Sequence, residues 1–424
     1  MHTAKKSNGE KMKVFFKTFG CRTNLFDTQV MRENLKSFEI TENEEEADII
    51  IVNSCTVTNG ADAGVRSYVN KVHRSGKRVY FTGCGVKTQG KNLFEKDLVF
   101  GGFSHTHKEQ IDTFLQQGER FFYQEEELES HIDKTIVSEF AGKVRAFIKI
   151  QEGCDFACSY CIIPSVRGIA RSYREGDILR QVGILAQGGV SEVVLTGTNV
   201  GSYGKDSGSN IAKLIKEIAK IDGIVRVRVG SLEPSQIDSE FLELLECDFL
   251  EKHLHIALQH THDSMLAIMN RQNRVESDYR LLEHIAGKGF AIGTDFIVAH
   301  PGETPQIWQE ALENLRALPL THIHPFIYSV RDNTPSAKMK LETNGKEAKA
   351  RLHQVNALIA EKNLAFRQRG QELRVLIESQ EAGRYSGLDQ FFNRIWVESE
   401  RALSGQWLEI CEYEVNERGN YAKV

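Results

Sequence analysis

The sequence predicts an α/β protein in three parts: an N-terminal doubly wound parallel sheet, a central partial (β/α)6 barrel and a small C-terminal antiparallel β-barrel. The first two parts are predicted because short apolar strands alternate with helical stretches, and because this rhythm starts afresh near residue 144. The third is predicted because short strands separated by glycine-containing turns follow the last long helical stretch. We expect domain bounds of 11–125, 140–370 and 371–424.

The first part alternates strands with helices, which favours parallel βαβ units. A helical period runs from Leu25 to Phe38, with Asn24 as its expected N-cap, and a second helix ends near Arg74. An acidic stretch, 119–139, reads as an interdomain connection. The expected strands are Lys13–Phe19, Ala47–Val52, Arg78–Thr82 and Leu98–Phe103.

Six further strand candidates, each followed by a helical stretch, predict the barrel, whose carboxyl end is where such barrels place their chemistry. The strands are expected at 144–150, 192–195, 225–229, 254–258, 290–298 and 322–328. Helices are expected at 177–187, 211–221, 235–245, 277–286, 305–318 and 344–369. The C-terminal strands are expected at 375–377, 392–397 and 408–415.

Composition indicates a globular protein with no export or membrane segment. The polar start has no apolar signal-peptide core, and no apolar run approaches the length of a membrane helix, so we expect a soluble, cytoplasmic protein. Eight cysteines in 424 residues then favour metal or catalytic use over disulfides. The net charge of −5 gives no global attraction to nucleic acid, so any such binding must come from local basic patches.

Three cysteines follow the first barrel strand at the spacing C-x3-C-x2-C: Cys154, Cys158 and Cys161. Iron–sulfur clusters are held by cysteine thiolates, usually four. A trio without a fourth cysteine nearby therefore indicates a cubane whose last iron is open to a non-protein ligand. The alternative is a structural zinc site, which needs a fourth nitrogen or sulfur ligand that the neighbouring sequence lacks.

A second trio is dispersed: Cys21, Cys55 and Cys84 each come one or more residues after one of the first three strands. Because the carboxyl ends of parallel strands share one edge of a sheet, and ligands gather at that edge, these three thiols can meet. They predict a second cluster, and the alternative is three unrelated buried cysteines.

The first trio, with an aromatic residue before its last cysteine (Tyr160), resembles the signature of the radical S-adenosylmethionine (SAM) enzymes. The resemblance implies that the open iron binds SAM, that reduction cleaves SAM to a 5′-deoxyadenosyl radical, and that Tyr160 lies near the adenine. Tyr160 could instead only shield the cluster from water.

The order of the three parts, with both trios, resembles the methylthiotransferases, whose last domain is a nucleic-acid-binding TRAM module. The resemblance implies two 4Fe-4S clusters and two SAM molecules: the SAM cluster on Cys154, Cys158 and Cys161, and a sulfur-donating cluster on Cys21, Cys55 and Cys84. It also implies tRNA as partner, a low-potential electron donor such as flavodoxin or ferredoxin, and a monomer.

Several short runs of the sequence resemble those of the MtaB-type enzymes, which place a methylthio group at C2 of N6-threonylcarbamoyladenosine beside the anticodon. The most telling run is Thr56-Val57-Thr58; the others are TFGCRTN, VNSCTVTNGAD, CSYCIIPSVRGIARS, LTGTNVGSYG and VRVGSLEPSQI. Isopentenyl-adenosine or a ribosomal-protein aspartate stays open as the substrate, and so does a non-catalytic iron–sulfur protein that binds RNA.

The resemblance also implies cofactor contacts from Thr196, Gly197 and Asn199, and more weakly from Gln259, Arg271 and Arg331. Gly197 could equally be a turn glycine, and the last three could be structural. The sequence departs from the family at Ala299-His300, where Gly-Phe is usual, at Asp332-Asn333, where Pro-Gly is usual, and in the run LQHTHD, which lacks Gln-Ser-Gly.

Residues 66–91 contain seven basic residues and no acidic one. Such runs are usually a solvated helix face. Beside a sulfur-inserting site for tRNA we expect them to contact phosphates, which supply sequence-independent affinity. The expected tRNA contacts are Arg66, Lys71, Arg74, Lys77, Arg78 and Lys87, with a second contribution from the basic helix after residue 344 and the terminal barrel.

Overall fold

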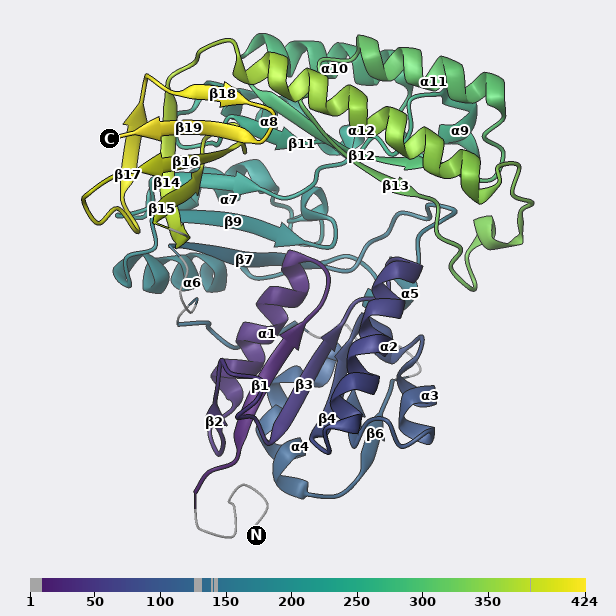
Figure 1. The fold of residues 1–424 in the computed structure, drawn as a ribbon, viewed down its shortest axis with the longest axis vertical. Coiled ribbons are helices and arrows are strands. Elements are labelled where there is room, and N and C mark those ends of the chain that lie inside the picture. Colours follow the sequence, from purple (N-terminus) through teal and green to yellow (C-terminus); the bar gives the residue numbers. More distant parts are fainter. Residues whose placement is uncertain (1–9, 126–131, 139, 141–143, 382) are drawn as a thin grey trace.

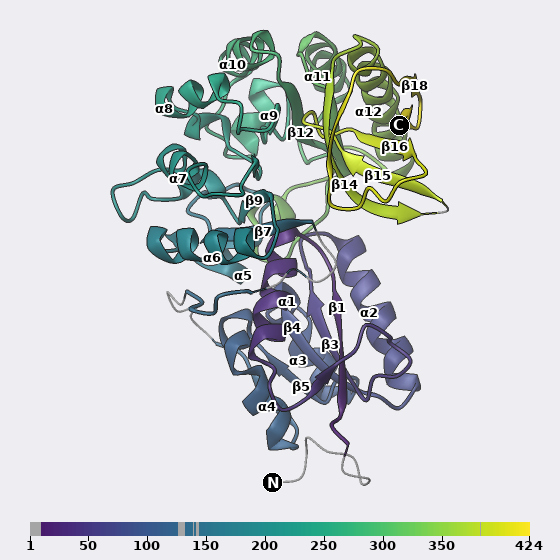
Figure 2. The ribbon, with the colours of Figure 1, turned by 90° about the vertical axis from the view of Figure 1, so that its left-hand side faces the viewer.

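The computed structural model describes residues 10–125, 132–138, 140, 144–381 and 383–424. A sheet covered by helices comes first in the chain, a barrel follows, and a curled sheet comes last (Figures 1 and 2). The barrel contacts both of the other parts. Across the described residues, every helix is too short or too polar to cross a membrane.

The first sheet is entirely parallel, with the strand order β2-β1-β3-β4-β5-β6. The order reverses beside β1, and the carboxyl ends of β1 and β3 at this reversal are the usual ligand position in such sheets. The short strand β6 lies in the acidic stretch 119–139, and neither β2 nor β6 was predicted as a strand. The bounds are β1 Lys13–Thr18, β2 Glu39–Ile40, β3 Ile49–Ser54, β4 Arg78–Gly83, β5 Gly101–Phe103 and β6 Phe121–Tyr123.

Helices cover both faces of this sheet, which confirms the doubly wound prediction. Alternate residues of β3 point to opposite faces. Ile49 and Ile51 join one apolar cluster, with residues of α1 and α4, whereas Ile50 and Val52 join a second, with residues of α2 and α3. The helix bounds are α1 Arg22–Asn34, α2 Asn59–Arg74, α3 Gly90–Glu95 and α4 Ile111–Gln117.

The sequence predicted Asn24 as the N-cap of α1, but Asn24 does not occupy that position. The helix begins at Arg22 with Cys21 in the cap position, and Asn24 is fully buried in its first turn. Its amide donates to the backbone oxygens of Phe19 and Ser54, at 2.8 and 2.9 Å. The prediction was wrong because tertiary partners at the strand ends outweigh local capping preference.

The barrel has six parallel strands, each followed by at least one helix, as predicted. They pair in two runs, β10-β9-β7 and β11-β12-β13, joined by isolated parallel bridges from Val227 to Leu250 and from Leu232 to Ile256. The short β8, Arg171–Ser172, pairs antiparallel with β7. The strands are β7 Arg145–Glu152, β9 Glu192–Gly197, β10 Arg226–Val229, β11 His253–His255, β12 Ala291–Val298 and β13 His322–Ile327.

The helices of this part pack an apolar cluster against the strands. The longest, α12, starts at the expected place, because Asn344 accepts hydrogen bonds from the backbone N–H groups of Lys346 and Glu347. The bounds are α5 Ile163–Arg167, α6 Glu175–Gln187, α7 Ile211–Ile218, α8 Ser239–Glu243, α9 Asp263–Ile268, α10 Val275–Gly287, α11 Pro305–Ala317 and α12 Gly345–Arg367.

The C-terminal part is a curled, mostly antiparallel sheet in the order β17-β14-β15-β16-β19-β18 (yellow in Figure 1). It is consistent with a TRAM-like domain, although β16 and β19 run parallel, which the sequence did not predict. The domain bounds stay a prediction. The strands are β14 Leu373–Glu381, β15 Arg384–Leu388, β16 Arg394–Glu398, β17 Trp407–Ile410, β18 Glu414–Asn416 and β19 Gly419–Lys423.

Buried charges join this sheet to the amino ends of the barrel strands. Glu192 pairs with Arg226 and with Arg228, the latter at 2.8 Å. The two arginines also donate to the backbone oxygens of Leu388 and Asp389. Burial opposes ionisation of Glu192, but the two arginines hold its pKa below the ordinary value. The carboxylate therefore stabilises the fold at neutral pH, and this contribution is lost as the pH falls into the acidic range.

We expect Glu192→Gln to lower the free energy of unfolding by about 3–5 kcal/mol at pH 7, because it removes the buried carboxylate that Arg226 and Arg228 share, and Arg228 keeps its pairing with Glu251. The matched control is Glu217→Gln, whose partner Lys220 is 68% exposed; that change should cost less than about 1 kcal/mol. Denaturant unfolding measures both. Equal losses in the two variants would contradict a structural role for the buried network.

Candidate functional site

The dispersed cysteines meet where the first sheet reverses its strand order. Cys21 follows β1, Cys55 follows β3 and Cys84 follows β4, so all three lie at the carboxyl edge. Their loops touch one another, since Ser54 donates to the backbone oxygen of Thr82 and accepts from the backbone N–H of Gly85. Cys55 and Cys84 are buried and Cys21 is exposed. The three residues lie at the predicted edge, and the cluster that they were predicted to hold stays a prediction.

A glycine in the left-handed region directly precedes Cys21, Cys84 and Cys154. The φ angles of Gly20, Gly83 and Gly153 are +93°, +88° and +76°. A Cβ at Gly20 would lie 2.5 Å from Cys55 Cβ, and one at Gly153 would lie 1.8 Å from the backbone oxygen of Ile169. Both the backbone conformation and the space therefore require glycine, which lets the cysteine loops turn tightly at the strand ends.

The compact trio lies in the loop that joins β7 to β8, and this loop also contains the short helix α5, which ends at Arg167. Its ends are fixed by backbone bonds, from Cys154 N–H to the oxygen of Gly168 and from Cys161 N–H to the oxygen of Cys158. Its middle is held at Ser159, whose backbone N–H donates to Met269. The loop thus closes on itself at the carboxyl end of the barrel, where the sequence placed it.

Two predicted cofactor residues lie against the sulfurs of this trio. Asn199 Nδ2 is 3.7 Å from Cys154 Sγ, and Arg271 Nη1 is 3.7 Å from Cys158 Sγ. Arg271 is oriented by Glu233, which accepts from both of its terminal nitrogens. The Oδ1 atom of Asn199 is buried and has no hydrogen-bond partner among the described residues, so it can accept a hydrogen bond from a ligand beside the trio.

Three other predicted cofactor residues lie in packed surroundings. Tyr160 packs against Met265 and Met269, and Thr196 is buried at the end of β9. Gly197 is a close-packing glycine, because a Cβ there would lie 2.8 Å from the backbone oxygen of Gln151.

Gln259 and Arg331 are placed differently. Gln259 has a φ of +68° and bonds to β12 through its backbone. Arg331 donates to Asp62 at 2.6 Å and to Asn59 at 2.8 Å, at the start of α2. It thereby ties the loop after β13 to the first sheet, and no described contact brings it to the compact trio.

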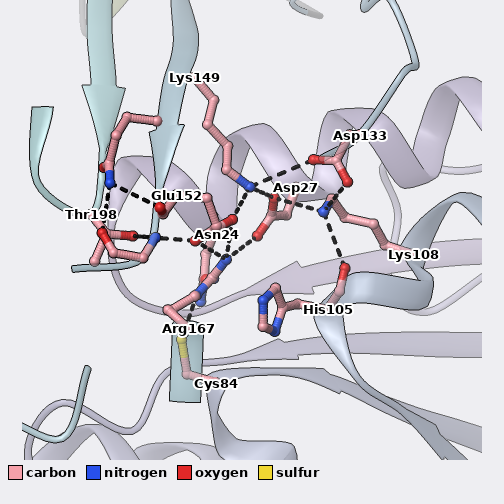
Figure 3. A network of polar contacts seen from close by, with 12 residues as sticks. Asn24, Asp27, Cys84, His105, Lys108, Asp133, Lys149, Glu152, Arg167 and Thr198 are labelled. Carbon is pink, nitrogen blue, oxygen red and sulfur yellow. Dashed lines mark hydrogen bonds and ion pairs between the residues drawn. The ribbon is translucent and has the colours of Figure 1, made fainter. Parts of the chain in front are cut away.

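A buried network of charges surrounds Arg167 beside Cys84 (Figure 3). Arg167, at the end of α5, donates through Nε to Cys84 Sγ at 3.1 Å and through Nη1 to Asp27 at 2.8 Å. It also contacts Glu152 and Asn24. Further ion pairs join Lys149 to Asp27 at 2.8 Å and Lys108 to Asp133 at 2.5 Å. The loop of the compact trio thus directly contacts a cysteine of the dispersed one.

The cysteine thiols of both trios are suited to bind iron. Burial raises the pKa of Cys84 to about 11 and that of Cys161 to about 12, and it also raises the pKa values of Cys55 and Cys154. Such thiols stay protonated unless a metal displaces the proton. In the described part of the chain, no three His, Cys, Asp or Glu side chains converge on a single ion position. Cysteines that hold a cubane bind separate irons, so this spread is compatible with clusters.

The predicted tRNA contacts spread along one side of the first part rather than forming one cluster. Arg66 and Arg74 are exposed on α2, and Lys87 follows Cys84 by three residues. Lys71 pairs with Glu44 at 3.2 Å, and Lys77 donates to the backbone oxygens of Glu44 and Glu45. Arg78 lies over the ring of Phe100. Two of the six predicted residues, Lys71 and Lys77, are therefore engaged by Glu44 and Glu45.

Sequence reasoning gave no role to Arg167, Glu152, Thr198 or Glu233. Thr198 donates to Glu152 and accepts from the backbone N–H of Gly153, both at 3.2 Å. Arg167 and Glu233 stand inside runs that were quoted for the resemblance, so their position was visible in the sequence. Their partners were not, because these come from distant segments.

Two family models match this chain. Residues 13–101 match the model described as uncharacterized protein family UPF0004. Residues 148–315 match the model of the radical SAM superfamily, which includes the compact trio.

Curated relatives span most of the chain. A putative methylthiotransferase of Helicobacter pylori (strain J99) is 62% identical over 97% of this chain and 99% of the relative. Threonylcarbamoyladenosine tRNA methylthiotransferase MtaB of Aquifex aeolicus is 35% identical over 86% of this chain and 93% of the relative. A tRNA-2-methylthio-N(6)-dimethylallyladenosine synthase of a Sulfurihydrogenibium species is 31% identical, covering 84% and 85%.

The fold is similar to that of the radical SAM methyltransferase TsrM from Kitasatospora setae, solved with cobalamin and a 4Fe-4S cluster bound. The TM-score is 0.59 with 16% identity, and the match covers 77% of both chains. At this identity, the likeness concerns the fold alone.

We expect Gly20→Ala to lose about half of the iron of the reconstituted protein, falling from about eight to about four irons per chain. The added methyl group would collide with Cys55, 2.7 Å from its sulfur, and displace a ligand of the dispersed trio. The control is Gly76→Ala, which has a similar φ of +74° but no atom within 4 Å of the new Cβ. Colorimetric iron analysis measures both, and full iron in Gly20→Ala would contradict the assignment.

Proposed function

This chain belongs to the radical SAM methylthiotransferase family, and from that premise we propose that it inserts a methylthio group at C2 of N6-threonylcarbamoyladenosine beside the anticodon of tRNA. Enzymes of this family use SAM and 4Fe-4S clusters. The observation that carries the proposal is the contact of Cys84, in the dispersed trio, with Arg167, which lies six residues after the compact trio. A radical source and a sulfur donor must both reach one carbon atom, and that contact brings their sites together.

The choice of substrate is supported by the relatives and by one loop. The MtaB relative is 35% identical to this chain, against 31% for the dimethylallyladenosine synthase. The loop after Cys55 carries Thr56-Val57-Thr58, the run typical of the MtaB type. Thr56 hydrogen-bonds Thr88 at 2.8 Å and Thr58 caps α2, which leaves Val57 46% exposed. An exposed apolar side chain beside a cysteine suits contact with a modified base.

We assign the cofactor ligands as follows. Cys154, Cys158 and Cys161 hold the SAM cluster, and Cys21, Cys55 and Cys84 hold the auxiliary cluster. Bound SAM and the clusters supply the radical and the sulfur. The chain's own part is to bury the site and to place hydrogen-bond donors on the sulfurs. We propose that five further residues contact the bound SAM: Tyr160, Thr196, Gly197, Asn199 and Arg271.

The tRNA footprint in this proposal lies on the first part of the chain. Arg66 and Arg74 are exposed on α2, whereas Lys71 and Lys77 bond to Glu44 and Glu45, and Lys87 lies three residues after Cys84. We further propose a cytoplasmic monomer with domains 11–125, 140–370 and 371–424, reduced by a flavodoxin- or ferredoxin-like donor.

The proposed substrate can be tested in cells by mass spectrometry of tRNA nucleosides. Deleting the gene should remove the methylthio group from N6-threonylcarbamoyladenosine and leave the unmodified parent nucleoside in its place. The wild-type gene should restore it, whereas a Cys158→Ala gene should not. Loss of the methylthio group from the isopentenyl nucleoside instead would support the rival substrate and contradict the proposal.

The footprint can be tested by charge reversal. Arg66→Glu/Arg74→Glu should weaken tRNA binding about tenfold or more at low salt and flatten its salt dependence, because phosphate contacts release counterions. The matched control is Lys220→Glu/Arg280→Glu, which reverses two exposed residues of the barrel part, Lys220 just after α7 and Arg280 on α10. Filter binding over a range of salt concentrations measures both. Equal effects in the two variants would indicate net charge rather than a footprint.

A further inference from the structure

Arg167 belongs to one cysteine loop but touches a cysteine of the other. It lies six residues after Cys161, in the segment that the compact trio begins. Its Nε–H donates to Cys84 Sγ at 3.1 Å, and its side chain is only 2% exposed. Around it, Ile162 and Val166 pack against Cys84 and shield the contact from water.

The rest of the guanidinium is already fixed by oxygen acceptors. Nη1 is held by Asp27 and Glu152, and Nη2 by the side-chain oxygen of Asn24. These acceptors come from α1 and β7, so both parts of the protein orient the group. Because acceptors hold both Nη1 and Nη2, the orientation of the guanidinium plane is set. In this orientation the Nε–H points at the sulfur of Cys84.

The charges around Arg167 balance. Three cations and three carboxylates make up the buried ion-pair network: Lys108, Lys149 and Arg167 with Asp27, Asp133 and Glu152. Arg167 therefore acts on Cys84 in two ways, through its nearby positive charge and through the directed N–H···S contact. Hydrogen bonds to the sulfurs of a cluster stabilise its reduced, more negative state and raise its reduction potential.

We propose that Arg167 is a positioning residue of the auxiliary cluster: it reaches from the SAM-cluster loop to hold the sulfur of Cys84 and raises the reduction potential of that cluster. This inference rests on the proposed role of Cys84 as a cluster ligand. It explains why a buried arginine follows the compact trio at the point where the two parts meet.

The test uses the reconstituted full chain with Cys154, Cys158 and Cys161 replaced by Ala, so that only the auxiliary cluster is present. Arg167→Lys keeps a positive charge but loses the planar fork and the N–H directed at sulfur. In an EPR-monitored redox titration, we expect it to shift the one-electron equilibrium about tenfold toward the oxidised cluster, which is 59 mV. The control is Asp27→Asn, which removes a carboxylate partner and leaves the sulfur contact; it should not lower the potential.

The outcomes separate the inference from its premise. An unchanged potential in Arg167→Lys, or an equal decrease in Asp27→Asn, would overturn the positioning role. Loss of iron in Arg167→Lys alone would support it, whereas loss of iron in both variants would show that the junction only supports folding and would overturn it. Cys84→Ala in the same background tests the premise: if it retains about four irons, the ligand assignment has failed instead.

Discussion

The pairing of buried charges between the first sheet and the barrel is the constraint on which the rest of the site depends. Charged groups are too costly to bury unless each finds its partner, and removing one member of a buried pair costs about 3–5 kcal/mol. Lys149 and Glu152 come from a barrel strand, whereas Asp27 comes from a helix of the first sheet. The network is therefore satisfied in one relative arrangement of the two parts, and that arrangement brings the two cysteine trios to a common junction.

A second buried network acts at the opposite end of the barrel. Glu192 and Arg226 begin β9 and β10, and Glu192 pairs with Arg226 and Arg228. The two arginines donate to backbone oxygens of the C-terminal part. The cysteine trios lie at the carboxyl end, beyond the length of these strands. The first network therefore acts at the end of the barrel that carries the cysteines, and the second attaches the last sheet at the other end. Changes in one network need not disturb the other.

The sequence predicted those features that local pattern determines. The cysteine trios, the strand rhythm and the carboxyl-edge placement all follow from spacing and period. Asn24 was misassigned because its residue type suits a cap, whereas its buried amide bonds to the ends of β1 and β3. Arg167 stood in a quoted run without a role, because its partners are contributed by segments up to 143 residues away. Pairings of that kind are tertiary, and no local period marks them.

Under the proposed function, the distribution of charge predicts the direction from which tRNA approaches. The C-terminal part, 371–424, carries ten acidic and six basic residues, so its charge does not favour phosphate, and the expected contribution of this part to the footprint lacks electrostatic support. Residues 66–91 carry only basic charges. Helix α2 begins four residues after Cys55, and its 16 residues extend about 24 Å from the cysteine edge. Phosphates bound along α2 would therefore lead a protruding base toward Val57 and the cysteines, with the backbone of the RNA held outside the buried charge network.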